Sequence, residues 1–197
     1  NRPHIGVFGR RNAGKSSLIN SLTNQELALV SDVPGTTTDP VYKAMELQPL
    51  GPVIMIDTAG IDDSGQLGEL RVKKTLEIIR KIDLAVLVID PEHGIENYEK
   101  DLLNRFFDAS TPIVPVINKV DLNFDQDNIL SKIKTEFKLN PVMVSTIADS
   151  GIEELREEIV TRMPADTEES FIVGDLVNPG DTIVLVTPID LAAPKGR

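Results

Sequence analysis

The sequence has 197 residues, of which 41% are hydrophobic and none is cysteine. This length and apolar content predict one packed domain plus a remainder, and the lack of cysteine excludes disulfides, thiol catalysis and cysteine-ligated metal centres within the chain. The net charge of −11 is divided unevenly, because residues 1–56 carry +1 and residues 57–197 carry −12. We therefore expect a polyanion to bind at the N-terminal third and expect no nucleic acid along the acidic remainder.

Strand-like and helix-like segments alternate along the first 163 residues. Short apolar runs predict strands over His4–Phe8, Val41–Leu47, Val53–Ile56, Leu84–Ile89, Ile113–Ile117 and Val142–Val144. Helical spacing of apolar residues predicts helices around 15–24, 66–82, 96–108, 126–138 and 151–162. Asp149 and Ser150 are the expected N-cap of the last helix. This alternation predicts an α/β fold, a doubly wound and mostly parallel sheet flanked by helices.

The pattern changes at Met163-Pro164. Residues 165–170 resemble an acidic linker, and a turn at 178–181 leads into a strand-like run at Thr182–Val186. A tail of this length is too short to build its own core. We predict one domain over 1–163, followed over 164–197 by a linker and the first strand of a truncated second domain.

A glycine-rich loop follows the first predicted strand. Its sequence Gly9-Arg10-Arg11-Asn12-Ala13-Gly14-Lys15-Ser16 has the G-x-x-x-x-G-K-S spacing between a strand and a helix, which is typical of a phosphate-binding loop. Lys15 is predicted to reach the β- and γ-phosphates, and Ser16 to bind Mg²⁺. The predicted nucleotide contacts in this segment are Asn12, Ala13, Gly14, Lys15, Ser16 and Ser17. The side chains of Arg10 and Arg11 are expected to be solvated, with contacts to a partner or to nucleotide phosphates as the alternative.

The sequence Asp57-Thr58-Ala59-Gly60 follows the third predicted strand. An aspartate at the end of a buried strand suits a second, water-mediated contact to Mg²⁺, and Gly60 would allow close approach to the γ-phosphate. By itself this segment is also compatible with a plain strand-ending turn.

A third motif, Asn118-Lys119-Val120-Asp121, ends the fifth predicted strand. The Asp121 carboxylate is predicted to accept from the ring N–H and the exocyclic amine of guanine, a donor pair that adenine lacks. The Lys119 stem would cover the base, and the turn Ser145-Thr146-Ile147 would present a backbone N–H to the base carbonyl.

The hydroxyl-rich segment 31–40 lies between the first helix and the second strand. A threonine in it is a candidate to complete the Mg²⁺ shell and close over the γ-phosphate. A solvated Thr-rich turn is the alternative.

These four motifs, in this order, resemble the G domain of translation-factor-related small GTPases. The run PGTTTD at 34–39 is similar to the first switch of the tRNA-modification and Era-like ribosome-assembly GTPases, which implies that Thr37 binds Mg²⁺. Three further runs resemble the [FeFe]-hydrogenase maturation GTPases of the HydF family: GTTTDPVYKAMELQPLGPV, IDDSGQLGELR and VLVTPIDLAAPKGR.

The resemblance implies a P-loop fold that binds GTP or GDP with Mg²⁺. Lys15, Asn12, Thr37 and Gly60 are the expected catalytic residues, and Asn12 is similar to the asparagine that binds K⁺ in potassium-activated relatives. Ile61 stands where many GTPases have the glutamine that orients the attacking water, so a low intrinsic rate is expected. An ordinary turn-stabilising role is the alternative for Asn12.

HydF relatives continue into a dimerisation domain and a cysteine-bearing [4Fe-4S] domain, so the resemblance places the cluster on a missing C-terminal part. It also implies a homodimer and, as partners, the hydrogenase and the other maturation proteins. No membrane span or signal peptide is evident, and a cytoplasmic location is expected. Three alternatives stay open: an RNA-modification or ribosome-assembly GTPase, an interaction module that binds GTP without significant hydrolysis, and an ATPase.

Overall fold

The computed structural model describes residues 2–24, 40–58, 68–122 and 124–164. All of them belong to one compact unit, Asn1–Pro164. A second unit, Ala165–Arg197, lies outside the described residues, and so do the predicted linker and the predicted strand at Thr182–Val186.

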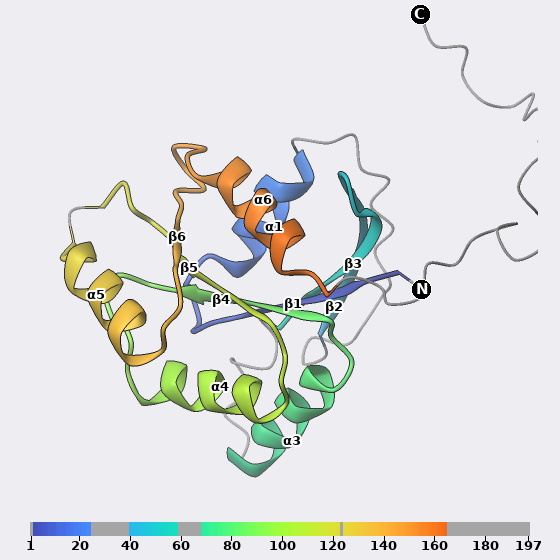
Figure 1. The fold of residues 1–197 in the computed structure, drawn as a ribbon, viewed down its shortest axis with the longest axis horizontal. Helices are drawn as coiled ribbons and strands as arrows, with labels where there is room; N and C mark the ends of the chain where they lie inside the picture. Colours follow the sequence, from blue (N-terminus) through green and yellow to red (C-terminus); the bar gives the residue numbers. More distant parts are fainter. Residues whose placement is uncertain (1, 25–39, 59–67, 123, 165–197) are drawn as a thin grey trace, which may run out of the picture. The chain divides into compact units, whose positions relative to one another are not determined.

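A single six-stranded sheet forms the centre of the first unit (Figure 1). Its strands are β1 (His4–Phe8), β2 (Val41–Leu47), β3 (Gly51–Asp57), β4 (Leu84–Ile89), β5 (Ile113–Ile117) and β6 (Val142–Met143). They lie in the order β2-β3-β1-β4-β5-β6. Only β2 runs antiparallel to its neighbour, β3, whereas the other neighbouring pairs are parallel. The predicted mostly parallel sheet is confirmed.

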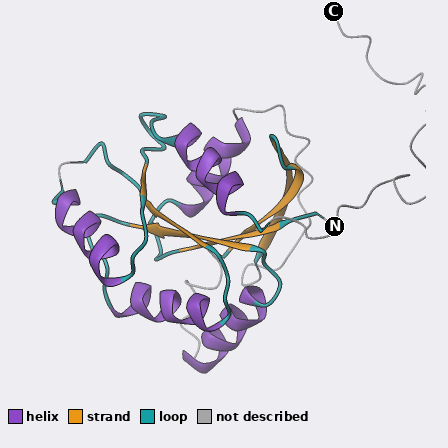
Figure 2. Cartoon of the chain, in the orientation of Figure 1, coloured by secondary structure: helices purple, strands orange, loops and turns teal. Residues whose placement is uncertain are grey.

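Helices cover both faces of this sheet (Figures 1 and 2). The described helices are α1 (Lys15–Asn24), α3 (Gly68–Ile79), α4 (Asn97–Asp108), α5 (Gln126–Glu136) and α6 (Ile152–Arg162). Helices α1 and α6 pack on one face, and α3, α4 and α5 pack on the other. The doubly wound α/β architecture is confirmed. In the part of the chain that the structure describes, no helix is both long enough and apolar enough to cross a membrane.

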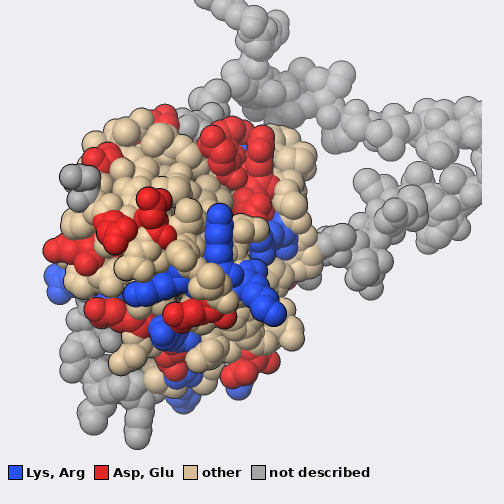
Figure 3. Space-filling view, turned by 60° about the vertical axis from the view of Figure 1, so that its left-hand side comes forward, with Lys and Arg blue, Asp and Glu red and all other residues tan. Residues whose placement is uncertain are grey.

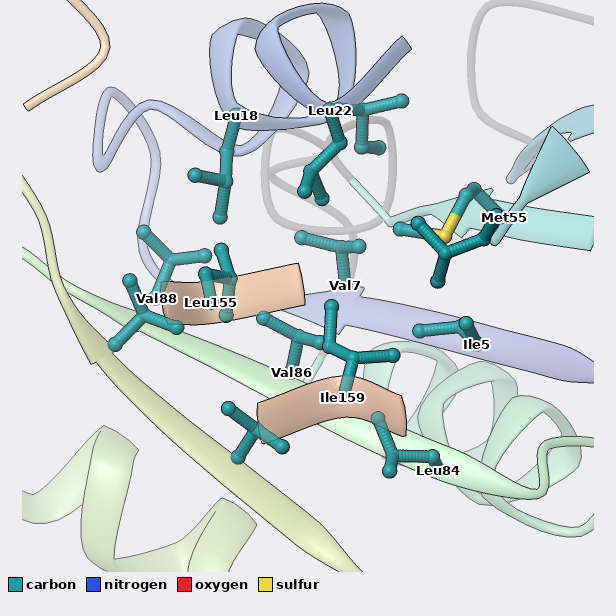
Figure 4. Packing of buried hydrophobic residues seen from close by; sticks show 14 of the residues in the cluster. Ile5, Val7, Leu18, Leu22, Met55, Leu84, Val86, Val88, Leu155 and Ile159 are labelled. Carbon is teal, nitrogen blue, oxygen red and sulfur yellow. The ribbon is translucent and has the colours of Figure 1, made fainter. Parts of the chain in front are cut away.

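The central strand β4 shows why both faces need helices. Its side chains alternate: Leu84, Val86 and Val88 join the core beneath α1 and α6 (Figure 4), and Ala85, Leu87 and Ile89 join the opposite core. Because successive strand residues point to opposite faces, a strand that is apolar throughout is buried on both sides. The run of apolar residues in the sequence is thus explained by two separate cores.

Several predicted boundaries are wrong by a few residues. Strand β3 extends beyond the predicted 53–56 because its first residue, Gly51, pairs with Leu47 across the hairpin. The helix predicted around 66–82 ends earlier, at Ile79, and residues 66–67 lie outside the described residues. The predicted cap of α6 is also wrong: the N-cap is Gly151, in a left-handed conformation, because the backbone of Ser150 is already paired with that of Ser145.

Candidate nucleotide-binding site

The candidate site lies at the carboxyl ends of the parallel strands. The loops that follow β1, β3, β4, β5 and β6 all leave the sheet at this edge, where α/β proteins bind their ligands. Side-chain bonds join these loops across the strands: Thr58 Oγ1 donates to Val7 O (2.7 Å), and Asn118 Nδ2 donates to Ala13 O (2.9 Å). Motifs that are far apart in the sequence therefore meet at one edge.

The loop between β1 and α1 has the tight backbone that its glycines require. Gly9 and Gly14 have φ angles of +145° and +94°. A Cβ on Gly9 would lie 2.3 Å from Val88 O, and a Cβ on Gly14 would lie 2.2 Å from Asn118 Nδ2. Both positions thus require glycine for conformation and for space, and the loop can approach its neighbours closely.

Lys15 begins α1 and is buried, with 4% of its surface exposed. Its Nζ donates to Gly9 O (2.6 Å) and to Arg10 O (2.8 Å), so the ammonium is held inside the curve of the loop. A buried ammonium needs such partners, because an uncompensated charge is costly to desolvate. The structure thus places the Lys15 ammonium within the phosphate loop, as the sequence motif predicts.

Two oxygen-bearing side chains meet beside this lysine. Ser16 Oγ donates to Asp57 Oδ2 at 2.6 Å, across 41 residues of sequence. Asp57 ends β3 and is buried, as predicted from the apolar run before it. A hydroxyl and a carboxylate oxygen in contact are ligand types that Mg²⁺ prefers.

Asn118 ties the end of β5 to the phosphate loop. It is 1% exposed, its backbone N–H donates to Ile89 O (3.1 Å), and its side-chain amide holds Ala13 as described above. Among the described residues, its Oδ1 has no hydrogen-bond partner. A buried polar atom without a partner points to a ligand group that would satisfy it.

The other polar residues of this motif are held by neighbouring loops. Lys119 Nζ forms an ion pair with Asp90 Oδ2 (2.6 Å), at the end of β4. Asp121 Oδ1 accepts from Ser145 Oγ (2.5 Å), and the Ser145 backbone N–H donates to Ser150 O. The Ser145 N–H is thus used within its own turn, and donation to the base by another backbone N–H of this turn stays a prediction. The Ser145 hydroxyl orients Asp121.

Other predicted site residues differ in how far the structure describes them. Asn12 is exposed in a left-handed conformation (φ 62°), Ser17 is exposed, and Thr146 is half-buried. The predicted contacts Thr37 and Gly60 lie outside the described residues, as do most of the two segments that carry them.

Three acidic residues, Asp90, Glu96 and Glu99, hold basic side chains of the site in pairings that were not predicted from the sequence. Arg10 is not simply solvated: it forms ion pairs with Glu96 and Glu99 at the start of α4. Asp90 was overlooked as the partner of Lys119. A signal for Asp90 exists in the sequence, because it directly follows an apolar strand, as Asp57 ends one. Glu99 carries no such signal, since it lies in the first turn of a helix that is largely polar on its outer face.

Fold and loop together define the class: this is a P-loop GTPase domain. Residues 4–119 match the family described as 50S ribosome-binding GTPase. The chain belongs to that family. Residues 172–197 separately match the family described as Hydrogen maturase F dimerization domain.

Individual relatives agree with this class. The tRNA modification GTPase MnmE of Aquifex aeolicus is 37% identical over 169 residues, covering 84% of this chain and 36% of that protein. GTPase Der of Clostridium botulinum is 34% identical over 143 residues, covering 71% of this chain and 32% of that protein. A solved variant of Era from Aquifex aeolicus, bound to GDP.AlF4−, is similar in fold, with a TM-score of 0.64 and 24% identity over 82% of this chain and 57% of that one. The chain spans about a third of the length of these curated relatives.

Proposed function

We propose that residues 1–163 are the GTP-binding and slowly GTP-hydrolysing switch domain of a scaffold that matures the hydrogenase iron–sulfur cluster. Residues 164–197 would begin its dimerisation domain. One observation carries this proposal: a match to the Hydrogen maturase F dimerization domain, at 172–197, follows a GTPase domain in the same chain. The HydF-like sequence runs in and around both switch segments support it independently.

The phosphate-binding role rests on the loop and its lysine. On nucleotide binding, Lys15 would exchange its bonds to the Gly9 and Arg10 carbonyls for bonds to β- and γ-phosphate oxygens. The loop amides and the N-terminus of α1 would add further donors. The left-handed residues already set the loop in a curved conformation, so less ordering is needed when phosphate binds.

Guanine recognition rests on the motif after β5. Asp121, oriented by the Ser145 hydroxyl, would accept two hydrogen bonds from the base. The unsatisfied Oδ1 of Asn118 lies in the same motif. Charge-assisted hydrogen bonds contribute about 1.5–3 kcal/mol each, so the pair at Asp121 would favour GTP over ATP by more than a hundredfold.

The residues present fit a magnesium ion. Ser16 Oγ would bind the ion directly, the adjacent Asp57 carboxylate would contact it through water, and Thr37 is the further ligand that the resemblance implies. Bound Mg²⁺ would neutralise charge on the β- and γ-phosphates. Asn12 offers an exposed amide on the same loop and is the proposed contact for K⁺.

The proposed reaction is hydrolysis by in-line attack of water on the γ-phosphorus. The bond from that phosphorus to the β–γ bridging oxygen breaks, and GDP and inorganic phosphate leave. Lys15 would stabilise the charge that develops on the phosphate oxygens. Ile61 has no polar atom with which to orient the water, which supports a slow intrinsic rate. As in other GTPase switches, the output would be ordering of the switch segments by GTP, read by the hydrogenase and its other maturation proteins.

A second candidate function is RNA modification or ribosome assembly, favoured by the 37% and 34% identities to MnmE and Der. Charge argues against it. On the face shown in Figure 3, Lys and Arg side chains gather in a band bordered by Asp and Glu. RNA binding favours a broad basic surface, whereas the basic band on this face is bordered by carboxylates and the chain has a net charge of −11.

Phosphate release in the presence of candidate effectors tests the proposal. Mg²⁺-dependent release of phosphate from GTP is measured with KCl or NaCl, then with added hydrogenase and maturation proteins, or with tRNA and ribosomal RNA. We expect slow release that KCl and the hydrogenase-side proteins increase and RNA does not. Stimulation by RNA alone would favour the second candidate. GTP binding without release under every condition would leave only an interaction module.

A further inference from the structure

One side chain connects the phosphate loop to a helix that none of the nucleotide motifs includes. Arg10, the second residue of the loop, donates from Nε to Glu99 Oε1 (2.6 Å) and from Nη2 to Glu99 Oε2 (3.1 Å). Its Nη2 also donates to Glu96 Oε2 (2.7 Å). Two parallel bonds between a guanidinium and a carboxylate fix direction as well as distance, so Arg10 is oriented by α4 across 89 residues of sequence.

Glu99 is held firmly enough to act as an anchor. Its side chain is 2% exposed, and besides Arg10 it accepts from the Glu96 backbone N–H (3.0 Å), completing a capping box at the start of α4. A buried carboxylate needs several donors to offset its lost hydration, and here Arg10 supplies two of them. Helix α4 is in turn fixed by Leu102, Leu103 and Phe106 in the core.

The backbone of Arg10 faces the other way, into the loop. Its carbonyl accepts from Lys15 Nζ (2.8 Å) and from the Ala13 N–H (3.2 Å). The hydrogen bond to Glu99 raises the pKa of the Arg10 guanidinium above its usual value despite partial burial. One residue thus joins the helix to Ala13 and Lys15 of the phosphate loop.

Packing alone does not hold Arg10 in this place. A cavity of about 710 Å³ borders it, lined also by Glu96 and Tyr98. The centroid of the Tyr98 ring lies 5.9 Å from the guanidinium carbon, at the outer limit of a cation–π contact, which is weaker than the charge-assisted bonds to the carboxylates. Without the Glu99 carboxylate, the Arg10 guanidinium would have room to move into this cavity. The first half of the phosphate loop would then lose its contact with α4. The second half would remain tied through Ala13 and Asn118.

We propose that Glu99 is a positioning residue for nucleotide binding, which acts through Arg10 to hold the first half of the phosphate loop in its binding conformation. This inference rests on the proposed nucleotide-binding function. It makes α4 part of the machinery that sets how long a nucleotide stays bound. A partner that moved the start of α4 would change nucleotide dissociation without touching the nucleotide.

Dissociation of fluorescent mant-GDP from the 197-residue chain, chased with excess GDP, tests the proposal. The variants are Glu99→Gln, Arg10→Gln and the double variant, with Glu136→Gln as matched control. Glu136, at the end of α5, forms an exposed ion pair of 3.2 Å with Lys100, which lies in α4 next to Glu99. We expect each single variant to dissociate about tenfold faster, the double variant to be no faster than the faster single one, and the control to stay within twofold of wild type.

Two further measurements separate positioning from loss of fold. Circular dichroism on heating establishes that each variant is folded at the assay temperature. Arg10→Lys keeps the charge and loses the two-pronged geometry, so its dissociation rate should fall between wild type and Arg10→Gln. This variant also carries the test if Glu99→Gln does not fold.

Three results would overturn the inference: a Glu99→Gln rate within twofold of wild type, multiplying effects in the double variant, or a fully wild-type rate for Arg10→Lys. These differ from a failure of the proposed function, in which the wild-type chain itself would not bind mant-GDP.

Discussion

Substituting alanine at Gly14 tests whether the phosphate loop has the geometry described here. The new Cβ would lie 2.2 Å from Asn118 Nδ2, at a residue whose φ is +94°. The side chain would meet two separate costs, an unfavourable backbone conformation and a steric clash with a buried amide. Relief of the clash requires Asn118 to move and release its bond to Ala13 O.

The expected magnitude follows from these two costs. Holding a non-glycine residue at such a φ costs about 1–3 kcal/mol. Breaking the Asn118–Ala13 bond leaves buried groups unsatisfied, at about 1–3 kcal/mol more. We therefore expect Gly14→Ala to lower the free energy of unfolding by about 2–6 kcal/mol and to abolish tight GTP binding.

Gly51→Ala is the matched control. Gly51 also has a positive φ, +75°, but a Cβ there would meet nothing within 4 Å. The free energy of unfolding in urea and the affinity for GTP are measured for both variants. Because both positions have a positive φ, the difference between the variants reports the clash with Asn118 and not the backbone conformation. We expect Gly14→Ala to be less stable than Gly51→Ala by about 1–3 kcal/mol, and Gly51→Ala to bind GTP as wild type does. Equal unfolding free energies for the two variants would refute the close approach of Asn118 to the loop.

Three other substitutions probe the remaining contacts. Asp121→Asn should shift preference from GTP toward xanthosine triphosphate in competition binding, since an amide donates where the carboxylate accepts; an unchanged preference would remove the guanine assignment. Asp90→Asn should weaken GTP binding several-fold in calorimetry, because Lys119 loses its ionic partner; wild-type affinity would show that the pair does not position the lysine. Asn12→Ala should abolish the difference between KCl and NaCl in phosphate release, and a retained KCl effect would contradict the K⁺ proposal.

The fold could be predicted because its signals are local. The apolar run Leu84–Ile89 is a strand with those bounds, and its full burial follows from alternation between two cores. The glycines of the phosphate loop were recognisable for the same reason, since spacing within one loop fixes where the backbone must turn. End residues were less predictable. The N-cap of α6 is Gly151 and not Asp149 or Ser150, because the backbone of Ser150 is hydrogen-bonded to that of Ser145.

The contacts that hold the site together could not be read from the sequence in the same way. In the sequence, Arg10 is one of two adjacent basic residues in a loop, and its partner Glu99 is one of several acidic residues in a helix. Neither position indicates that the two side chains form an ion pair. Their pairing exists because parallel strands β1 and β4 are neighbours, which brings the loop after one beside the helix after the other. The same holds for Lys119 with Asp90, across β5 and β4. Such pairs depend on the relative placement of loops, which no local pattern encodes.

Equilibrium binding of GTP and ATP to the 197-residue chain, each with Mg²⁺, tests the central claim most directly. Titration calorimetry would give both affinities and the stoichiometry in one experiment. We predict one GTP per chain and an ATP affinity weaker by at least about a hundredfold, as two charge-assisted hydrogen bonds to Asp121 require. Equal affinities for the two nucleotides, or no binding of GTP, would contradict the account.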